Sequence, residues 1–213
     1  MFRSDSNGRL NTIYILGKRG VGKTSLLNIL LGREYDENVR KSKIGITTYY
    51  KQDDKDLIFK ELTDDENFTF TKILKNSLEE IILIIIVFDI DDEDTLEYAK
   101  SLILFINNNI TYNLGIQIIL MGNKYDSKKI NNAKIKVNQI EAENFVVDID
   151  NCSFYELSCK TGLNIDIIEK TINEINNNNS YLRNSKEMDK DDLNNIDTVK
   201  INNGRSSDSC VVF

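Results

Sequence analysis

A glycine-rich segment between the first predicted strand and the first predicted helix most constrains the fold of this 213-residue chain. Apolar residues predict a short buried strand over Thr12–Leu16, and the pattern of Thr24–Leu31 predicts a helix that ends at Gly32. The segment between them, Gly17–Thr24, reads GKRGVGKT and matches G-x-x-x-x-G-K-[ST] in full. Such a loop turns tightly with its N–H groups toward phosphate oxygens, next to the partial positive charge of a helix N-terminus. The alternative is an ordinary glycine-rich turn.

Two side chains of this loop carry the predicted chemistry. Lys23 is expected to neutralise the β- and γ-phosphates of a nucleotide, and the hydroxyl of Thr24 can bind Mg²⁺. The loop therefore predicts a nucleotide-binding protein.

Strand and helix patterns alternate along the chain to about Ile175. Further strands are expected over Ile44–Gln52, Leu57–Leu62, Ile81–Ile90, Ile116–Met121 and Phe154–Leu157. Further helices are expected over Phe68–Leu78, Glu93–Ile106, Asn138–Val146 and Asn164–Ile175. The alternation predicts an α/β fold with a mostly parallel sheet and helices on both faces. A polar turn over Gln52–Asp56 predicts a hairpin, which adds one antiparallel edge strand.

Composition excludes several classes of function. The net charge of −7 argues against a nucleic-acid partner. The absence of His removes His-based acid–base catalysis and His-ligated zinc, and three cysteines without paired spacing favour a reducing, cytoplasmic setting. The longest apolar run, Ile81–Phe88, is far shorter than the roughly 20 residues of a membrane-spanning helix. The first ten residues also lack the pattern of a secretory signal.

The chain is expected to contain one domain over residues 10–178, preceded by an extension over residues 1–9. Residues 179–213 have few apolar residues and are expected to form a disordered tail. The tail ends in Cys210-Val211-Val212-Phe213, which fits C-a-a-X with a terminal Phe that favours geranylgeranylation of Cys210. A chance ending is the alternative. One prenyl chain without a polybasic block is expected to anchor reversibly.

Two polar segments follow predicted strands at the carboxyl edge of the sheet, where open α/β sheets bind ligands. Asn123-Lys124-Tyr125-Asp126 follows the strand that ends at Met121, and Ser158-Cys159-Lys160 follows the last strand. The Asp126 carboxylate can accept from the N1–H and the exocyclic amine of guanine together, a donor pair that adenine lacks. Taken alone, the first segment would be only a solvated loop.

With these motifs the chain resembles small GTPases of the Ras superfamily, and most of all the Rab branch, from about Arg9 to Ile175. The resemblance rests on seven segments, which are Gly17–Ser25, Lys43–Ile46, Glu66–Phe68, Val87–Ile90, Asn123–Asp126, Glu141-Ala142 and Ser158–Lys160. It implies the P-loop NTPase fold with a six-stranded sheet and five helices. It also implies GTP or GDP with Mg²⁺, a switch between two nucleotide states, and effector, exchange-factor and escort proteins as partners.

The resemblance assigns nucleotide contacts to individual residues. It places the stem of Lys124 beside the base, and the backbone of Ser158, Cys159 and Lys160 beside the guanine O6. The expected phosphate-side contacts are Gly17, Arg19, Gly20, Val21, Gly22, Lys23, Thr24 and Ser25, and the base-side contacts are Asn123, Lys124, Asp126, Ser158, Cys159 and Lys160.

Both switch segments depart from the family pattern. Lys43 stands where the family has a Mg²⁺-binding Thr, and the preceding Ser42 is a candidate substitute. The family's D-x-x-G-Q is replaced by Glu61-Leu62-Thr63-Asp64-Asp65, and no glycine lies between Gly45 and Gly115. Glu61 could reach Mg²⁺ through water, whereas Asp65 stands where a Gln orients the attacking water.

Arg19 is a third departure, since the Ras branch has glycine at this position. It either points into solvent or presents its guanidinium to the γ-phosphate as an arginine finger supplied in cis. The parts that bind guanine and the β-phosphate are intact, so we expect nucleotide binding with slow hydrolysis.

The sequence thus predicts a Rab-like GTPase that regulates vesicle traffic on the cytosolic face of an internal or plasma membrane. One alternative is a pseudo-GTPase that binds GTP or GDP without turnover and serves as an interaction module. Another is a phosphate-loop kinase or ATPase, against which the segments at Asn123–Asp126 and Ser158–Lys160 argue.

Overall fold

A computed structural model describes residues 11–39, 45–51, 57–63, 80–109, 116–127 and 139–177. The chain divides into two units, Met1–Asn173 and Glu174–Phe213, and the architecture below belongs to the first, apart from the last four residues of the final helix. The predicted extension over residues 1–9 and the predicted tail over residues 179–213 lie outside the described residues.

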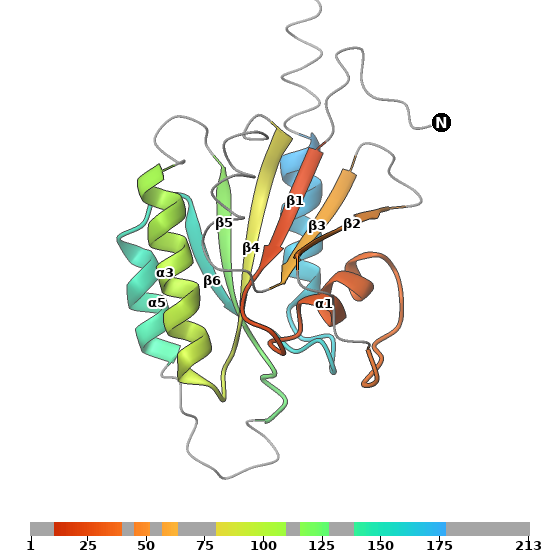
Figure 1. Ribbon diagram of the computed structural model, residues 1–213, viewed down its shortest axis with the longest axis horizontal. Helices are drawn as coiled ribbons and strands as arrows, with labels where there is room; N and C mark the ends of the chain where they lie inside the picture. The colour runs from red at the N-terminus through yellow and green to blue at the C-terminus, as the bar shows by residue number, and fades with distance from the viewer. Residues whose placement is uncertain are drawn as a thin grey trace, which may run out of the picture. The chain divides into compact units, whose positions relative to one another are not determined.

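One six-stranded sheet organises the domain, with the strand order β2-β3-β1-β4-β5-β6 (Figure 1). Only β2 runs antiparallel, against β3, and the other pairs of neighbours are parallel. The strands are β1 (Asn11–Leu16), β2 (Gly45–Tyr50), β3 (Leu57–Thr63), β4 (Ile81–Asp89), β5 (Gln117–Asn123) and β6 (Cys152–Glu156). The predicted mostly parallel sheet with an antiparallel edge strand is confirmed.

Helices cover both faces of the sheet, as the alternation predicts. The helices are α1 (Lys23–Leu30), α3 (Glu93–Asn109), α5 (Gln139–Val147) and a last helix over residues 165–177. Figure 1 shows α3 and α5 on one face and α1 on the other, together with the start of the last helix. The resemblance implied five helices, and the described residues contain four, because the expected helix over Phe68–Leu78 lies outside them. None of the described helices has the length and apolar character to cross a membrane.

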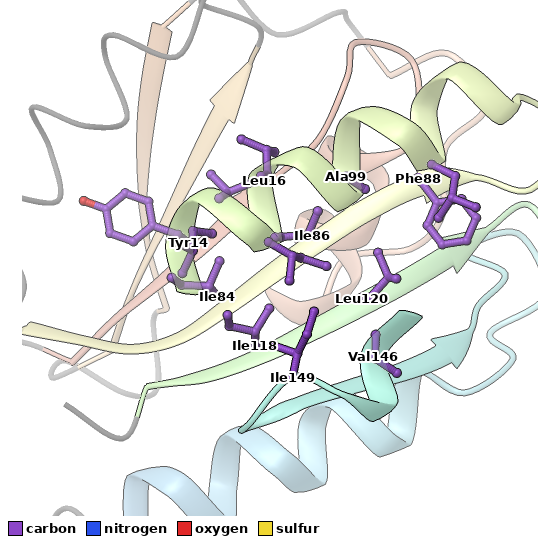
Figure 2. Packing of buried hydrophobic residues seen from close by; sticks show 14 of the residues in the cluster. Tyr14, Leu16, Ile84, Ile86, Phe88, Ala99, Ile118, Leu120, Val146 and Ile149 are labelled. Atoms are coloured by element: carbon purple, nitrogen blue, oxygen red, sulfur yellow. The ribbon is translucent and has the colours of Figure 1, made fainter. Parts of the chain in front are cut away.

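The hydrophobic core lies between the sheet and the pair α3 and α5. Alternate residues of three neighbouring strands point into it, so that Leu16, Ile86 and Leu120 pack together (Figure 2). From the helices, Ala99 and Val146 close the layer. Strand β4 is buried along Ile81–Phe88, which explains why it reads as one continuous apolar run. This packing fixes the carboxyl ends of β1, β4, β5 and β6 at one edge of the sheet.

Most element boundaries differ from the sequence prediction by one to three residues. Strand β5 extends to Asn123, two residues beyond the expected end at Met121, because Asp89 of β4 still pairs with Asn123. Helix α3 extends to Asn109 rather than ending at Ile106. The turn at residues 52–56 and Asn138 at the expected start of α5 lie outside the described residues.

Candidate functional site: a nucleotide-binding edge

The loop from Gly17 to Gly22 joins the end of β1 to the start of α1. Gly17 has φ +137° and lies so close to β4 that a Cβ there would overlap the Val87 carbonyl oxygen. A glycine is therefore required at this position. The ammonium of Lys23, with its side chain 3% exposed, donates hydrogen bonds to the carbonyl oxygens of Gly17 and Lys18, both at 2.8 Å. The loop thus holds a buried cation at its centre, where Lys23 was expected to meet phosphate.

Thr24 and Glu61 meet at the first turn of α1. The Thr24 hydroxyl donates to Glu61 Oε1 at 2.7 Å, and Tyr49 on β2 donates to Glu61 Oε2 at a long 3.5 Å. Glu61 lies on β3 and is 1% exposed. Hydroxyl and carboxylate oxygens are the ligands that Mg²⁺ prefers, so this pair fits the predicted metal. The described part of the chain contains no group of three or more Asp, Glu or Cys side chains that could hold a metal ion.

Asn123 ties together the three loops of the site. Its side-chain amide donates to the Val21 carbonyl oxygen at 2.8 Å, and its Oδ1 accepts from the backbone N–H of Cys159 at 3.2 Å. The residue is 3% exposed. Gly22 lies against it, with φ +101° and no room for a Cβ beside the Asn123 amide. A single buried amide therefore fixes the phosphate loop relative to both predicted base-reading segments.

Asp126 is held by the loop after β6. Ser158, which is fully buried, donates its hydroxyl to Asp126 Oδ1 at 2.6 Å and accepts at the same oxygen from the Thr161 N–H at 3.2 Å. The Tyr125 N–H donates to the Leu157 carbonyl at 3.0 Å, which joins the two segments through backbone as well. The hydrogen bond from Ser158 thereby orients the Asp126 carboxylate.

Burial sets the chemistry of the neighbouring Cys159. It is 4% exposed, and burial raises the pKa of its thiol to about 12. The thiol therefore stays protonated at neutral pH and acts as an apolar side chain. The Cys159 N–H donates to Asn123 Oδ1, and the predicted contact of this backbone segment with guanine O6 stays a prediction.

Three residues of this edge were not singled out from the sequence. Tyr35, 38% exposed, lies near the base-reading segments. Desolvation and then the charge of Glu37 raise its pKa, against a smaller lowering by Lys160. Asp89 at the end of β4 forms an ion pair with Lys124. Tyr49 contacts Glu61. Asp89 belongs to the segment Val87–Ile90 on which the resemblance rests, but no role was assigned to it there, and the two tyrosines belong to no motif.

The other predicted site residues either make no contact with the residues above that bears on their predicted role, or lie outside the described residues. Arg19 is exposed on the phosphate loop, and Lys160 forms an ion pair with Glu37, from the segment after α1. Ser42, Lys43, Asp64, Asp65 and Cys210 lie outside the described residues, so their predicted roles stay predictions.

A phosphate loop after β1 and two base-reading segments at the same sheet edge define a P-loop protein built to bind a nucleotide. The chain belongs to the Ras family, whose model matches residues 12–177. It is also similar to proteins from two strains of Lactobacillus delbrueckii subsp. bulgaricus, each called probable GTP-binding protein EngB. Each is 28% identical over 179 residues, which cover 78% of this chain and 86% of the relative. The described domain is therefore a Ras-family GTP-binding domain.

Proposed function

We propose that this protein is a Rab-like, guanine-nucleotide-dependent regulator of vesicle traffic that binds GTP or GDP with Mg²⁺. The observation that carries the nucleotide assignment is the Asp126 carboxylate, fixed by Ser158 at 2.6 Å on the sheet edge that also holds Lys23. This carboxylate matches the two donors of guanine, and Lys23 matches the phosphates. Competition of GTP and ATP for the purified protein tests the assignment. Equal binding of ATP would support the alternative of a kinase or ATPase.

We further propose that GTP hydrolysis is slow. Asp64 replaces the glycine whose N–H meets the γ-phosphate, and Asp65 replaces the Gln that orients the attacking water. A single-turnover assay with GTP and Mg²⁺ should show slow release of phosphate. The double change Asp64→Gly with Asp65→Gln should raise the rate. A rapid wild-type rate would contradict this proposal and would favour Arg19 as a replacement. No turnover at all would favour the pseudo-GTPase that acts as an interaction module.

We also propose that a prenyl lipid on Cys210 attaches the protein to the cytosolic face of an internal or plasma membrane. The support is the C-a-a-X ending and the acidic charge of the chain, since anionic leaflets weakly repel an acidic protein without a lipid. Cys210→Ser should move the protein to the soluble fraction and leave nucleotide binding unchanged. Phe213→Ser should switch the lipid from geranylgeranyl to farnesyl. Retention of Cys210→Ser on membranes would show that a protein partner holds it there.

The proposed role in traffic also needs partners that read the nucleotide state. Effectors, exchange factors and escort proteins are the expected classes. Affinity capture with the protein loaded separately with GDP and with a non-hydrolysable GTP analogue tests this expectation. A set of partners that does not depend on the nucleotide would contradict a switch and favour a constitutive interaction module.

A further inference from the structure

Asp89 is the last residue of β4 and lies beside the predicted base-reading segment that follows β5. It pairs across the sheet with Asn123, and the Ile90 N–H donates to the Asn123 carbonyl at 3.2 Å. Its carboxylate has two partners. Asp89 Oδ1 accepts from the Asp91 N–H at 3.0 Å, and Asp89 Oδ2 accepts from Lys124 Nζ at 2.5 Å. The first bond anchors the carboxylate to its own turn, and the second joins it to the residue that directly follows β5.

The backbone around Asp89 is fixed independently of that ion pair. Its N–H donates to the Thr95 hydroxyl at 2.9 Å, and Thr95 is 4% exposed at the start of α3. The Asp89 side chain itself is only 15% exposed, whereas that of Lys124 is 43% exposed. The aspartate is thus the fixed partner, and the lysine is the long side chain whose position it determines.

Lys124 also has an unusual backbone. Its φ is +70°, in the left-handed region that residues other than glycine rarely adopt. Such strain persists where the surroundings fix it, commonly at ligand sites. Here the Ser127 N–H donates to the Lys124 carbonyl at 2.9 Å, and the next residue, Tyr125, is bonded to Leu157. The backbone and the ammonium of Lys124 are therefore both held in place.

We propose that Asp89 is a positioning residue for the nucleotide site, which acts by holding the Lys124 side chain beside the bound guanine base. The proposal rests on the guanine-nucleotide site proposed above. A long side chain that is already immobilised loses less conformational freedom when the nucleotide binds. Without the carboxylate, Lys124 is free to leave the base, and bound GDP should dissociate about two- to tenfold faster.

Dissociation of fluorescently labelled GDP tests this in four proteins: wild type, Asp89→Asn, Lys124→Met and the double variant. Asn keeps an Oδ1 for the Asp91 N–H but has no charge for Lys124, and Met keeps an apolar stem without an ammonium. Asp91→Asn, an exposed change of equal charge on the same turn, is the matched control. Thermal unfolding of each variant with GDP bound checks the fold.

The expected result is faster dissociation for Asp89→Asn in the wild-type background and no added effect in the Lys124→Met background. Equal acceleration in both backgrounds would show that Asp89 acts through the fold of its turn and would overturn the proposal. A rate no different from that of Asp91→Asn would overturn it, and so would slower dissociation. Preference for GTP over ATP should survive in Asp89→Asn, because Asp126 reads the base. A wild type that retains no guanine nucleotide would instead refute the nucleotide assignment itself.

Discussion

The Thr24 hydroxyl donates a hydrogen bond of 2.7 Å to the carboxylate of Glu61, 37 positions later in the chain. Parallel pairing of β1 with β3 brings this about, since Ile15 near the end of β1 lies opposite Glu61. A carboxylate that is 1% exposed needs donors or a cation close by, because burying an unpaired charge is strongly unfavourable. The carboxylate oxygens of Glu61 therefore lie beside the Thr24 hydroxyl, at the position where Mg²⁺ is expected to bind.

Glu61→Gln is expected to weaken the effect of Mg²⁺ on nucleotide retention. The change keeps the shape of the side chain and removes its charge, and the loss of one carboxylate close to a metal typically lowers metal affinity about 10–100-fold. Dissociation of GDP measured with Mg²⁺ and with a chelator gives the size of the effect. Glu169→Gln, an exposed change on the last helix, is the control. An undiminished Mg²⁺ effect in Glu61→Gln would contradict the assignment.

Alanine at two glycines of the phosphate loop should have unequal effects. Gly20 and Gly22 have φ +87° and +101°, so both substitutions introduce left-handed strain of about 1–2 kcal/mol. A Cβ at Gly20 meets nothing within 4 Å, whereas one at Gly22 would overlap the Asn123 amide. Displacing this amide breaks its buried bond to Val21, so Gly22→Ala should be less stable than Gly20→Ala by about 1–3 kcal/mol. Urea unfolding with GDP present measures the difference, and equal stabilities would contradict the packing.

Most of the fold could be predicted from the pattern of apolar residues. The short, Ile-rich apolar stretch of β4 indicates a strand buried on both faces, and Leu96, Ala99 and Ile103 mark the buried side of α3. The end of β5 was misplaced because Asn123 looks like a loop residue. Its side chain is buried by specific hydrogen bonds to Val21 and Cys159, which hydrophobic periodicity does not encode.

Site residues could be predicted from the sequence where they belong to a motif of consecutive residues. Lys23 and Asp126 belong to such motifs, and the structure brings both to one edge of the sheet. The partners that orient them come from distant positions: Ser158 holds Asp126, and Asp89 holds Lys124. A single Asp at a strand end has no pattern of its own, so only the register of β4 against β5 reveals its partner.

Asp126→Asn should reverse base preference from guanine toward xanthine nucleotides. The amide cannot accept from both guanine donors, but it can donate to the C2 oxygen of xanthine.

Ser158 donates to Asp126 Oδ1 at 2.6 Å, so Ser158→Ala should weaken GDP binding in the wild-type background through loss of a bond worth about 1 kcal/mol or more. Competition between labelled GDP and xanthosine diphosphate measures both effects. Unchanged guanine preference in Asp126→Asn would exclude this carboxylate as the base reader.

One buried and one partly buried thiol, those of Cys159 and Cys152, should make the fold sensitive to alkaline pH. Burial raises the pKa of Cys159 to about 12 and that of Cys152 to about 12. In the unfolded chain these thiols lose their protons near pH 9, so above that pH the unfolded state binds fewer protons than the folded state. The free energy of unfolding should therefore fall as pH rises from about 9 toward 12, by up to about 1.4 kcal/mol per pH unit for each thiol.

The contribution of one thiol can be isolated by comparing Cys152→Ala with its parent, both in a Cys210→Ser background that leaves only the two described thiols. Urea unfolding at pH 7.5, 9 and 10 should show the variant losing less stability with pH than the parent, by roughly 1 kcal/mol between the upper two values. Other titrating groups, including Tyr14 with a pKa raised to about 12 by burial, affect both proteins alike and cancel in the comparison. Parallel stability curves for variant and parent would show that Cys152 titrates equally in the folded and unfolded chains, contrary to its partial burial at the start of β6.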